Sequence, residues 1–97
     1  EPFEQAEAFA ALAKGVKKLN LDIMTYTGYT YEYLRENSSR HRGWSALLDE
    51  TDILVDGRYE SDKRNLLLKF RGSENQRIID VNRTKAENRI VIMNEQI

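Results

Sequence analysis

Apolar side chains recur every three or four positions at the start of the chain. The repeating positions are Phe3, Ala6, Phe9, Ala13, Val16 and Leu19. This spacing places them on one face and predicts an amphipathic helix over residues 4–19. Pro2 and Glu4 suit the first turn of that helix, and Lys17 and Lys18 suit the negative end of its dipole.

Short apolar runs and polar breaks alternate in the segment that follows. The pattern predicts a strand at 21–27, a helix that begins after Thr30, a polar loop at 37–43, a helix around 44–48 and a strand at 53–55. The last run is apolar at every position, which is typical of a strand buried on both faces. Strand, helical segments and strand at this spacing predict a βαβ unit with parallel strands and a right-handed crossover.

The C-terminal part of the chain has a different pattern. Residues 78–81 and 90–93 are short β-favouring runs separated by the polar stretch 82–89. They predict two strands that pair antiparallel, joined by that stretch. Taken together, the elements predict an α/β fold with parallel βαβ units and a C-terminal strand pair, in a single domain over 1–97.

Polar residues follow the two parallel strands at the point where each strand ends. Thr27 and Gly28 follow the first strand, and Asp56 follows the second. If a strand also precedes the first helix, Glu1 occupies the same edge. Ligands of parallel α/β sheets bind beyond the carboxyl ends of the strands, so these four residues form a candidate binding rim. The alternative is that Asp56 and Gly57 make a tight hairpin turn.

The polar loop before residue 78 is the second candidate site. It contains Arg71, Gly72, Ser73, Asn75 and Gln76, which combine a flexible backbone position with several hydrogen-bond donors. Such a loop suits an anion or a polar small molecule, and a solvated surface loop is the alternative. The lone histidine, at position 41, has no carboxylate or hydroxyl at catalytic spacing, and we assign it no role.

Composition narrows the classes of partner. The 97 residues are 32% charged with a net charge of −1, which argues against a nucleic-acid or membrane-surface binder held by bulk positive charge. Residues 58–89 nevertheless carry a net charge of +4 and could face an anionic partner. No apolar run approaches the roughly 18 residues of a membrane span, and no signal peptide is evident, so we expect a cytoplasmic protein.

The absence of cysteine limits the chemistry further. With none in the chain, these residues hold no disulfide framework, thiolate zinc site or cysteine-ligated iron–sulfur cluster.

Three motifs, in order, resemble one known family. They are LDIMTYTGYT at 21–30, TDILVDG at 51–57 and FRGSENQ at 70–76. The chain is similar to the C-terminal half of the activating proteins of anaerobic ribonucleotide reductases, which are radical S-adenosylmethionine enzymes. Glu1 and Pro2 then resemble the end of the family's Gly-Gly-Glu-Pro motif. The resemblance covers essentially the whole chain.

The resemblance implies part of a (β/α) barrel in which a 4Fe-4S cluster binds and reduces S-adenosylmethionine. It places Glu1 near the methionyl ammonium and Thr27, Gly28 and Asp56 around the cofactor. The loop residues Arg71, Gly72, Ser73, Asn75 and Gln76 would lie over the site. The implied partners are the glycyl-radical subunit of anaerobic ribonucleotide reductase and a reductant such as flavodoxin.

One departure from the family is large. The family's Cys-x-x-x-Cys-x-x-Cys motif lies N-terminal to Gly-Gly-Glu-Pro and is absent here, so the chain alone is not expected to be active and holds no metal ligands. An uncovered sheet edge would then favour self-association of the fragment. The alternatives are a stand-alone, non-catalytic α/β interaction module and an activase of another glycyl-radical enzyme.

Overall fold

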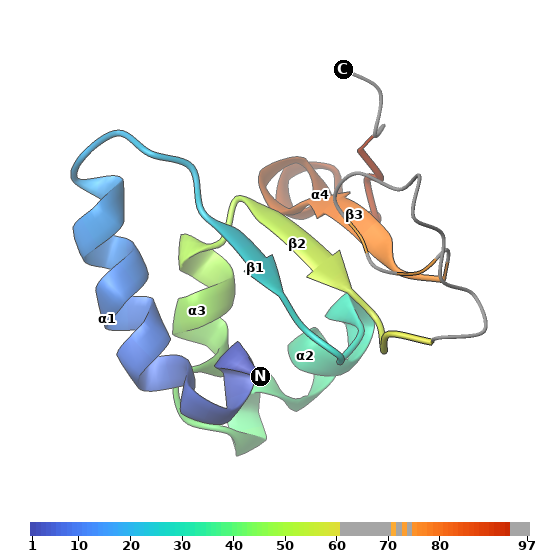
Figure 1. Ribbon diagram of the computed structural model, residues 1–97, viewed down its shortest axis with the longest axis horizontal. Helices are drawn as coiled ribbons and strands as arrows, with labels where there is room; N and C mark the ends of the chain where they lie inside the picture. Colours follow the sequence, from blue (N-terminus) through green and yellow to red (C-terminus); the bar gives the residue numbers. More distant parts are fainter. Residues whose placement is uncertain (61–70, 72, 74, 94–97) are drawn as a thin grey trace.

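A small mixed sheet with helices packed around it forms the structure, a computed structural model that describes residues 1–60, 71, 73 and 75–93 (Figure 1). In chain order its elements are the 3₁₀ helix η1 (Pro2–Gln5), α1 (Ala6–Lys17), β1 (Met24–Tyr26), α2 (Tyr31–Asn37), the 3₁₀ helix η2 (Ser38–Arg40), α3 (Trp44–Glu50), β2 (Ile53–Asp56), β3 (Arg77–Asp80) and α4 (Val81–Glu87). The α/β class expected from the sequence is confirmed. Within the described part of the chain, no helix has the length and apolar character needed to cross a membrane.

The sheet has the strand order β1-β2-β3. β1 and β2 are parallel, with Thr25 opposite Leu54, and the chain between them passes through α2, η2 and α3. This confirms the predicted βαβ unit. β3 joins the other side of β2 in the antiparallel sense, with Ile79 opposite Leu54. β1 is shorter than predicted, because its pairing with β2 begins only at Met24.

The N-terminal helical segment starts as a 3₁₀ turn before it becomes α1. The Glu1 carboxylate caps this turn by accepting a hydrogen bond from the Phe3 N–H at 2.9 Å, and Pro2 stands at a first-turn position, where no N–H is needed. α1 then packs beside α3, along the outer side of β1 (Figure 1). The predicted helix over residues 4–19 is therefore confirmed, with an irregular first turn.

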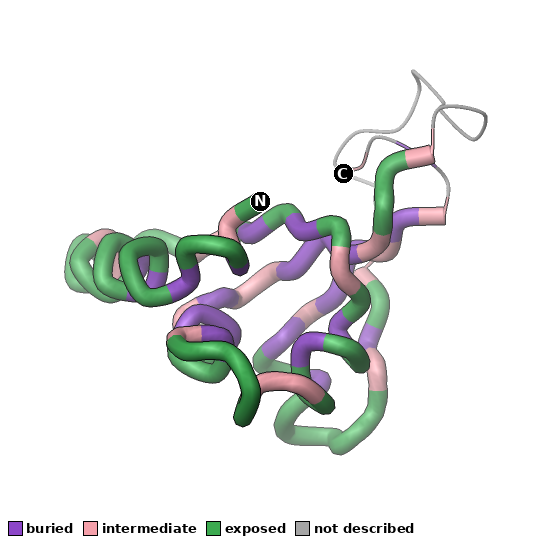
Figure 2. Tube along the Cα trace, turned by 90° about the horizontal axis from the view of Figure 1, so that it is seen from below, coloured by how far each residue is buried: buried purple, intermediate pink, exposed green. Residues whose placement is uncertain are grey.

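The core lies between the helices and one face of the sheet. Leu54 and Ile79 from the strands meet Leu34 and Leu48 from the helices, and all four side chains are buried. Trp44 joins them and donates its indole N–H to the Phe3 carbonyl at 2.8 Å, which satisfies its polar atom in the core. Buried positions accordingly gather on the sides of helices that face the strands, while the outer turns of α1 are exposed (Figure 2).

The C-terminal part matches the prediction in its pairing but not in its connection. The segment around Ile92 lies antiparallel to β3, since the Asp80 N–H donates to the Val91 carbonyl at 2.9 Å and Ile79 pairs with Ile92. The stretch 82–89, expected to be a plain connection, contains most of α4. Val81, placed in a strand by the prediction, begins this helix, because Asp80 caps it through the Arg83 N–H at 3.0 Å.

Candidate functional site

The Glu1 carboxylate lies at the carboxyl end of β1. It accepts hydrogen bonds from the Thr27 hydroxyl at 3.0 and 3.1 Å and from the Gly28 N–H at 2.8 Å. Three residues of the predicted rim are thus in direct contact, although 26 or 27 positions separate Glu1 from the other two. Glu1 is exposed, so its carboxylate remains accessible from solvent.

The turn after β1 connects this carboxylate to the end of β2. The Thr27 hydroxyl accepts a hydrogen bond from the Tyr29 N–H at 3.1 Å, and the Tyr29 carbonyl accepts one from the Gly57 N–H at 2.9 Å. Gly57 has a φ of 97°, a left-handed conformation that glycine adopts without strain. The carboxyl ends of the two parallel strands therefore form one continuous hydrogen-bonded edge.

Asp56 completes the rim but faces protein groups. Its side chain is 1% exposed and accepts hydrogen bonds from the Tyr31 N–H at 2.8 Å and from Arg77 Nε at 2.9 Å. Its strand partner across the sheet is Arg77. The alternative of a tight Asp56–Gly57 hairpin is therefore wrong, since the strand that follows is distant in sequence.

Arg77 is a functional candidate that the sequence analysis did not single out. Its guanidinium bridges the buried Asp56 and the exposed Glu32, with 2.5 Å between the closest atoms of each pair. Hydrogen bonds from Arg77 hold the pKa of Glu32 below its ordinary value, against the effect of partial burial. The same two carboxylates raise the pKa of Arg77, so the guanidinium stays charged. Its position directly after the loop motif, at the start of an apolar strand, was the available signal.

The second candidate site, the polar loop, lies against Gly57. Gln76 donates its side-chain amide to the Gly57 carbonyl at 2.9 Å, and Asn75 donates to the Arg58 carbonyl at 2.7 Å. Arg71 donates to the Gln76 carbonyl at 2.8 Å, and the Ser73 hydroxyl accepts from the Glu60 N–H at 3.2 Å. Three of the five predicted loop residues, Ser73, Asn75 and Gln76, are thus hydrogen-bonded to the segment that follows β2, and Arg71 is bonded to Gln76 within the loop. The fifth, Gly72, lies outside the described residues.

One polar atom in this loop has no partner. The side-chain oxygen of Asn75 is buried and accepts no hydrogen bond in the structure. A buried acceptor without a donor costs roughly 1–3 kcal/mol. The atom therefore marks an unsatisfied polar position beside the edge that carries Gly57.

The assembled edge has the chemistry of a binding site. It offers a carboxylate, a hydroxyl, backbone amides and carboxamides, which suit a polar, charged small molecule. Within the described residues, no group of three or more potential ligands among His, Cys, Asp and Glu is placed to hold a metal ion. His41, assigned no role, stacks on Trp44 at 4.0 Å between ring centroids.

A known protein and a protein-family model both match this chain. The "Anaerobic ribonucleoside-triphosphate reductase-activating protein" of Pasteurella multocida (strain Pm70) is 37% identical over 55 residues, which are 57% of this chain and 32% of that protein. The match thus spans about a third of the relative's length. No solved structure matches the chain. Residues 1–79 match the model of a protein family described as a 4Fe-4S single cluster domain, and the chain belongs to that family.

Proposed function

We propose that this chain is the part of an anaerobic ribonucleotide reductase activating protein that positions S-adenosylmethionine. The observation that carries the proposal is the Glu1 carboxylate held against Thr27 and Gly28 at the carboxyl end of β1. A fixed, accessible carboxylate at this edge suits a cationic group such as the ammonium of a methionyl moiety. The similarity to the Pasteurella multocida activating protein supports the same assignment.

Each candidate residue has a defined task in this proposal. Glu1 binds the ammonium, and the backbone of Gly28 and the hydroxyl of Thr27 fix the direction of its carboxylate. Asp56 acts indirectly, by holding Tyr31 and Arg77 in place at the end of β2. Such positioning residues matter because small displacements in a binding site reduce reactivity strongly.

The loop forms the other wall of the proposed site. Asn75, Ser73 and Gln76 fix the loop on the segment that follows β2, and Arg71 donates to the Gln76 carbonyl within the loop. Gly72 belongs to the same loop in the proposal. S-adenosylmethionine, if bound here and given one electron by a reduced iron–sulfur cluster, would supply the radical chemistry proposed for the assembled protein. The tasks of this chain are to bind that cofactor, to orient it and to limit its contact with water.

The 4Fe-4S cluster of the family does not fit the residues present. Clusters of this type are held by cysteine thiolates, and the chain contains none. The described residues also contain no other group of ligands that could replace them. In the proposal, a cysteine-bearing polypeptide therefore holds the cluster, and the 97 residues contribute the edge that faces it.

The partners proposed for the assembled protein are the glycyl-radical subunit of anaerobic ribonucleotide reductase and an electron donor such as flavodoxin, in the cytoplasm. Among the described residues no strand pairs with the side of β1 opposite β2, which supports a further proposal, that the isolated chain self-associates at high concentration.

Binding of S-adenosylmethionine to the N-terminally acetylated chain tests the assignment. Acetylation removes the terminal ammonium of Glu1, which would compete with the ligand for its carboxylate. In a nuclear magnetic resonance titration to millimolar ligand, we expect the amide signals of Gly28, Gly57 and Asn75 to shift. The amides of α4 serve as the internal reference and should not move.

Matched variants give the titration its controls. Glu1→Gln keeps the size of the side chain and removes its charge. The apparent affinity measured from the Gly28 shift should therefore fall about tenfold or more. Glu7→Gln makes the same change on α1, away from the rim, and should leave the affinity unchanged. Equal affinities for the two variants, or shifts confined to α4, would contradict the proposed site and favour the non-catalytic interaction module.

A further inference from the structure

A polar cleft of about 670 Å³ lies between α2 and α4. None of the four rim residues lines it, so a ligand in the cleft would not occupy the rim. Both helices pack on the same face of the sheet, because Leu34 of α2 and Val81 of α4 belong to one core with Ile79. The lining of the cleft includes Tyr31 and Arg35 from α2, Thr84 and Lys85 from α4, and Arg89 and Ile90 from the residues that follow α4.

The floor of the cleft offers two hydroxyl groups. Tyr31 is 7% exposed and Thr84 is 4% exposed. Within the described part of the chain, Tyr31 donates its backbone N–H to Asp56, while its hydroxyl has no hydrogen-bond partner. The Thr84 hydroxyl accepts a hydrogen bond from the Val91 N–H at 3.0 Å, which leaves its own proton for another acceptor. Because polar groups are costly to bury without partners, a ligand that carries oxygen acceptors suits this floor.

The walls of the cleft carry basic side chains whose charge is only partly balanced. Arg35, in the last turn of α2, forms no ion pair with any residue that the structure describes. Arg89 bonds to Glu87 at 2.6 Å, but Arg83 bonds to the same carboxylate at 2.9 Å. One carboxylate therefore balances two guanidiniums. The two walls can accordingly bind a further anion.

The acidic side chains around the cleft do not cancel this charge. Glu32 lines the cleft, but its carboxylate is bound by Arg77. Lys85 bonds to Asp49 at 2.9 Å, and the Asp49 side chain is 59% exposed, so this pair is weak and can be exchanged for a carboxylate of a ligand. Three basic lining residues thus face one lining carboxylate, that of Glu36, which has no ion pair within the described residues.

We propose that the cleft between α2 and α4 binds an acidic segment of a partner protein, with carboxylates at Arg35, Lys85 and Arg89 and an apolar side chain on Ile90. The basic residues come from both walls, and Lys85 and Arg89 are one helical turn apart, so several carboxylates on one chain fit them better than a single small anion. Ile90 is partly buried against the core and offers an apolar contact. The proposal goes beyond the proposed function, because it uses no residue of the rim.

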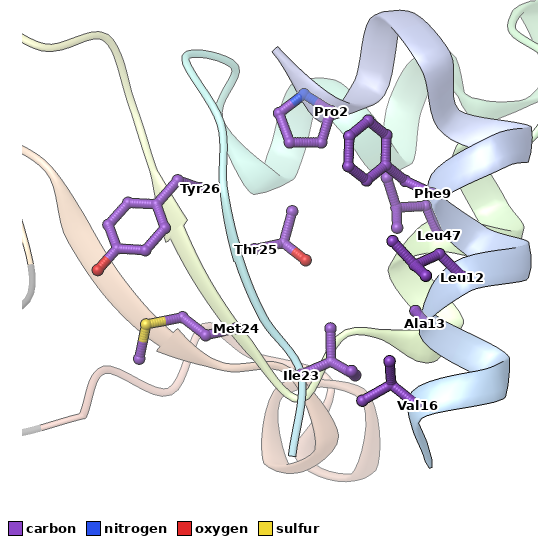
Figure 3. Close-up of a pocket in the computed structure, with 10 residues that line it drawn as sticks. All are labelled: Pro2, Phe9, Leu12, Ala13, Val16, Ile23, Met24, Thr25, Tyr26 and Leu47. Carbon is purple, nitrogen blue, oxygen red and sulfur yellow. The ribbon is translucent and has the colours of Figure 1, made fainter. Parts of the chain in front are cut away.

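The groove between α1 and β1 provides a contrasting surface on the same molecule. Its lining includes Phe9, Leu12 and Val16 and contains no basic side chain (Figure 3). An acidic segment therefore gains no charge pairing there. The amide signals of Leu12 and Val16 can serve as the reference when binding to the cleft is measured.

Two synthetic peptides test the proposal on the full 97-residue chain. One is Glu-Glu-Leu-Glu-Glu with blocked ends, and the other is Gln-Gln-Leu-Gln-Gln, which has the same length and apolar residue without the charge. In a nuclear magnetic resonance titration to millimolar peptide, the acidic peptide should shift the amide signals of Arg35, Lys85 and Asn88. The neutral peptide should bind at least about tenfold more weakly. Added salt should weaken the acidic peptide, because the Debye length falls from about 30 Å at 0.01 M to about 8 Å at 0.15 M.

Two charge reversals provide matched variants. Arg35→Glu should weaken binding of the acidic peptide at least about fivefold, because it replaces an attraction by a repulsion. Lys14→Glu makes the same change in net charge at an exposed position in the last turn of α1 and should leave the affinity unchanged. Tyr31→Phe removes only the hydroxyl of the floor and should weaken binding about threefold without lowering stability, since that hydroxyl has no partner among the described residues.

Three results would overturn the proposal. The first is equal affinity for the acidic and neutral peptides, and the second is equal affinity in Arg35→Glu and Lys14→Glu. The third is inorganic phosphate that shifts the same amides with the affinity of the acidic peptide, because this assigns the cleft to a small anion. The proposed function is tested independently, since binding of S-adenosylmethionine is measured at Gly28, Gly57 and Asn75.

Discussion

The Asp56 side chain bonds to protein groups, although the sequence predicted it at an edge that binds a ligand. Its position after an apolar strand indicated a group that faces a ligand. The structure gives both carboxylate oxygens protein partners: Oδ2 accepts from the Tyr31 N–H, and both oxygens accept from Arg77. A buried carboxylate needs such donors, because burial without them is costly. We therefore expect Asp56 to contribute to stability as well as to the site.

The first prediction concerns Asp56→Asn, which keeps the volume of the side chain. The amide provides a single acceptor oxygen and directs an NH₂ group at donors, so at least one charge-assisted hydrogen bond is lost. We expect the free energy of unfolding to fall by about 1.5–3 kcal/mol, measured by urea denaturation. Glu32→Gln removes the exposed partner of the same arginine and should cost less than about 1 kcal/mol. Similar small losses in both variants would contradict a structural role for Asp56.

The second prediction concerns Tyr29, whose hydroxyl donates a hydrogen bond to the Glu4 carboxylate. This hydrogen bond, followed by burial and by the charges of Glu4 and Glu1, raises the pKa of Tyr29 from 10.0 to about 12. The folded protein therefore keeps a proton that the unfolded chain loses, so the contribution of Tyr29 to stability is complete below pH 10 and disappears as the pH rises towards 12.

Ultraviolet titration of tyrosine ionisation measures this effect. The wild-type chain should contain one tyrosine that ionises near pH 12, and Tyr29→Phe should remove that late phase. Glu4→Gln removes the charge of the acceptor and should move the phase back towards pH 10, since the hydrogen bond to Glu4 is the largest cause of the shift. A late phase that survives in Tyr29→Phe would show that another tyrosine produces it.

At the scale of elements, capping residues define both ends of α4. Asp80 caps the helix through the Arg83 N–H, and Asn88 ends it in a left-handed conformation with φ of 55°. The third prediction is that Asp80→Ala lowers the free energy of unfolding by about 1 kcal/mol, through loss of the cap. Asp80→Ser keeps an acceptor oxygen and should retain most of the stability in the same denaturation experiment.

The elements that the sequence predicted well are those with a strong apolar period. α1 and the βαβ unit belong to this group, because their buried residues recur regularly and their ends carry recognisable capping residues such as Thr30. α4 was missed because its seven residues bury only Val81 and Thr84, so no helical stripe is visible. Its cap residue, Asp80, is also the last residue of β3, so the apolar run was interpreted as a strand that continues through Val81.

Part of the candidate site was predictable from the sequence. The contact of Glu1 with Thr27 and Gly28 agrees with a general rule about the carboxyl ends of parallel strands, although the sequence placed Glu1 there only on the condition that a strand precedes the first helix. The inward orientation of Asp56 was not predictable, because it depends on where Arg77 lies, and β3 pairs antiparallel to β2 from a distant part of the sequence. The antiparallel pairing of Ile79 with Ile92 followed from the spacing of two apolar runs.

At the scale of the whole molecule, the chain lacks the cysteine ligands that the description of its family implies. The chain has a packed core, a strand edge with accessible polar groups and a match to a 4Fe-4S family over residues 1–79. It has no cysteine to hold such a cluster. The two observations are compatible when the cluster ligands and the residues proposed to bind the cofactor are carried by different segments of polypeptide.

The last prediction follows from the absence of cluster ligands in this chain. Iron and sulfide added anaerobically to the 97-residue chain should give no stoichiometric cluster, because carboxylates, amides and one histidine do not replace the cysteine thiolates that hold a 4Fe-4S centre. Visible absorption and iron analysis after gel filtration measure the result, with an established cysteine-ligated ferredoxin treated in parallel as the control. The chain should elute without bound iron while its helical circular dichroism stays unchanged, since the core of the described residues is built from apolar side chains. A retained cluster at one per chain would require an unusual ligand set within these residues, and would contradict the proposal that another polypeptide holds the cluster.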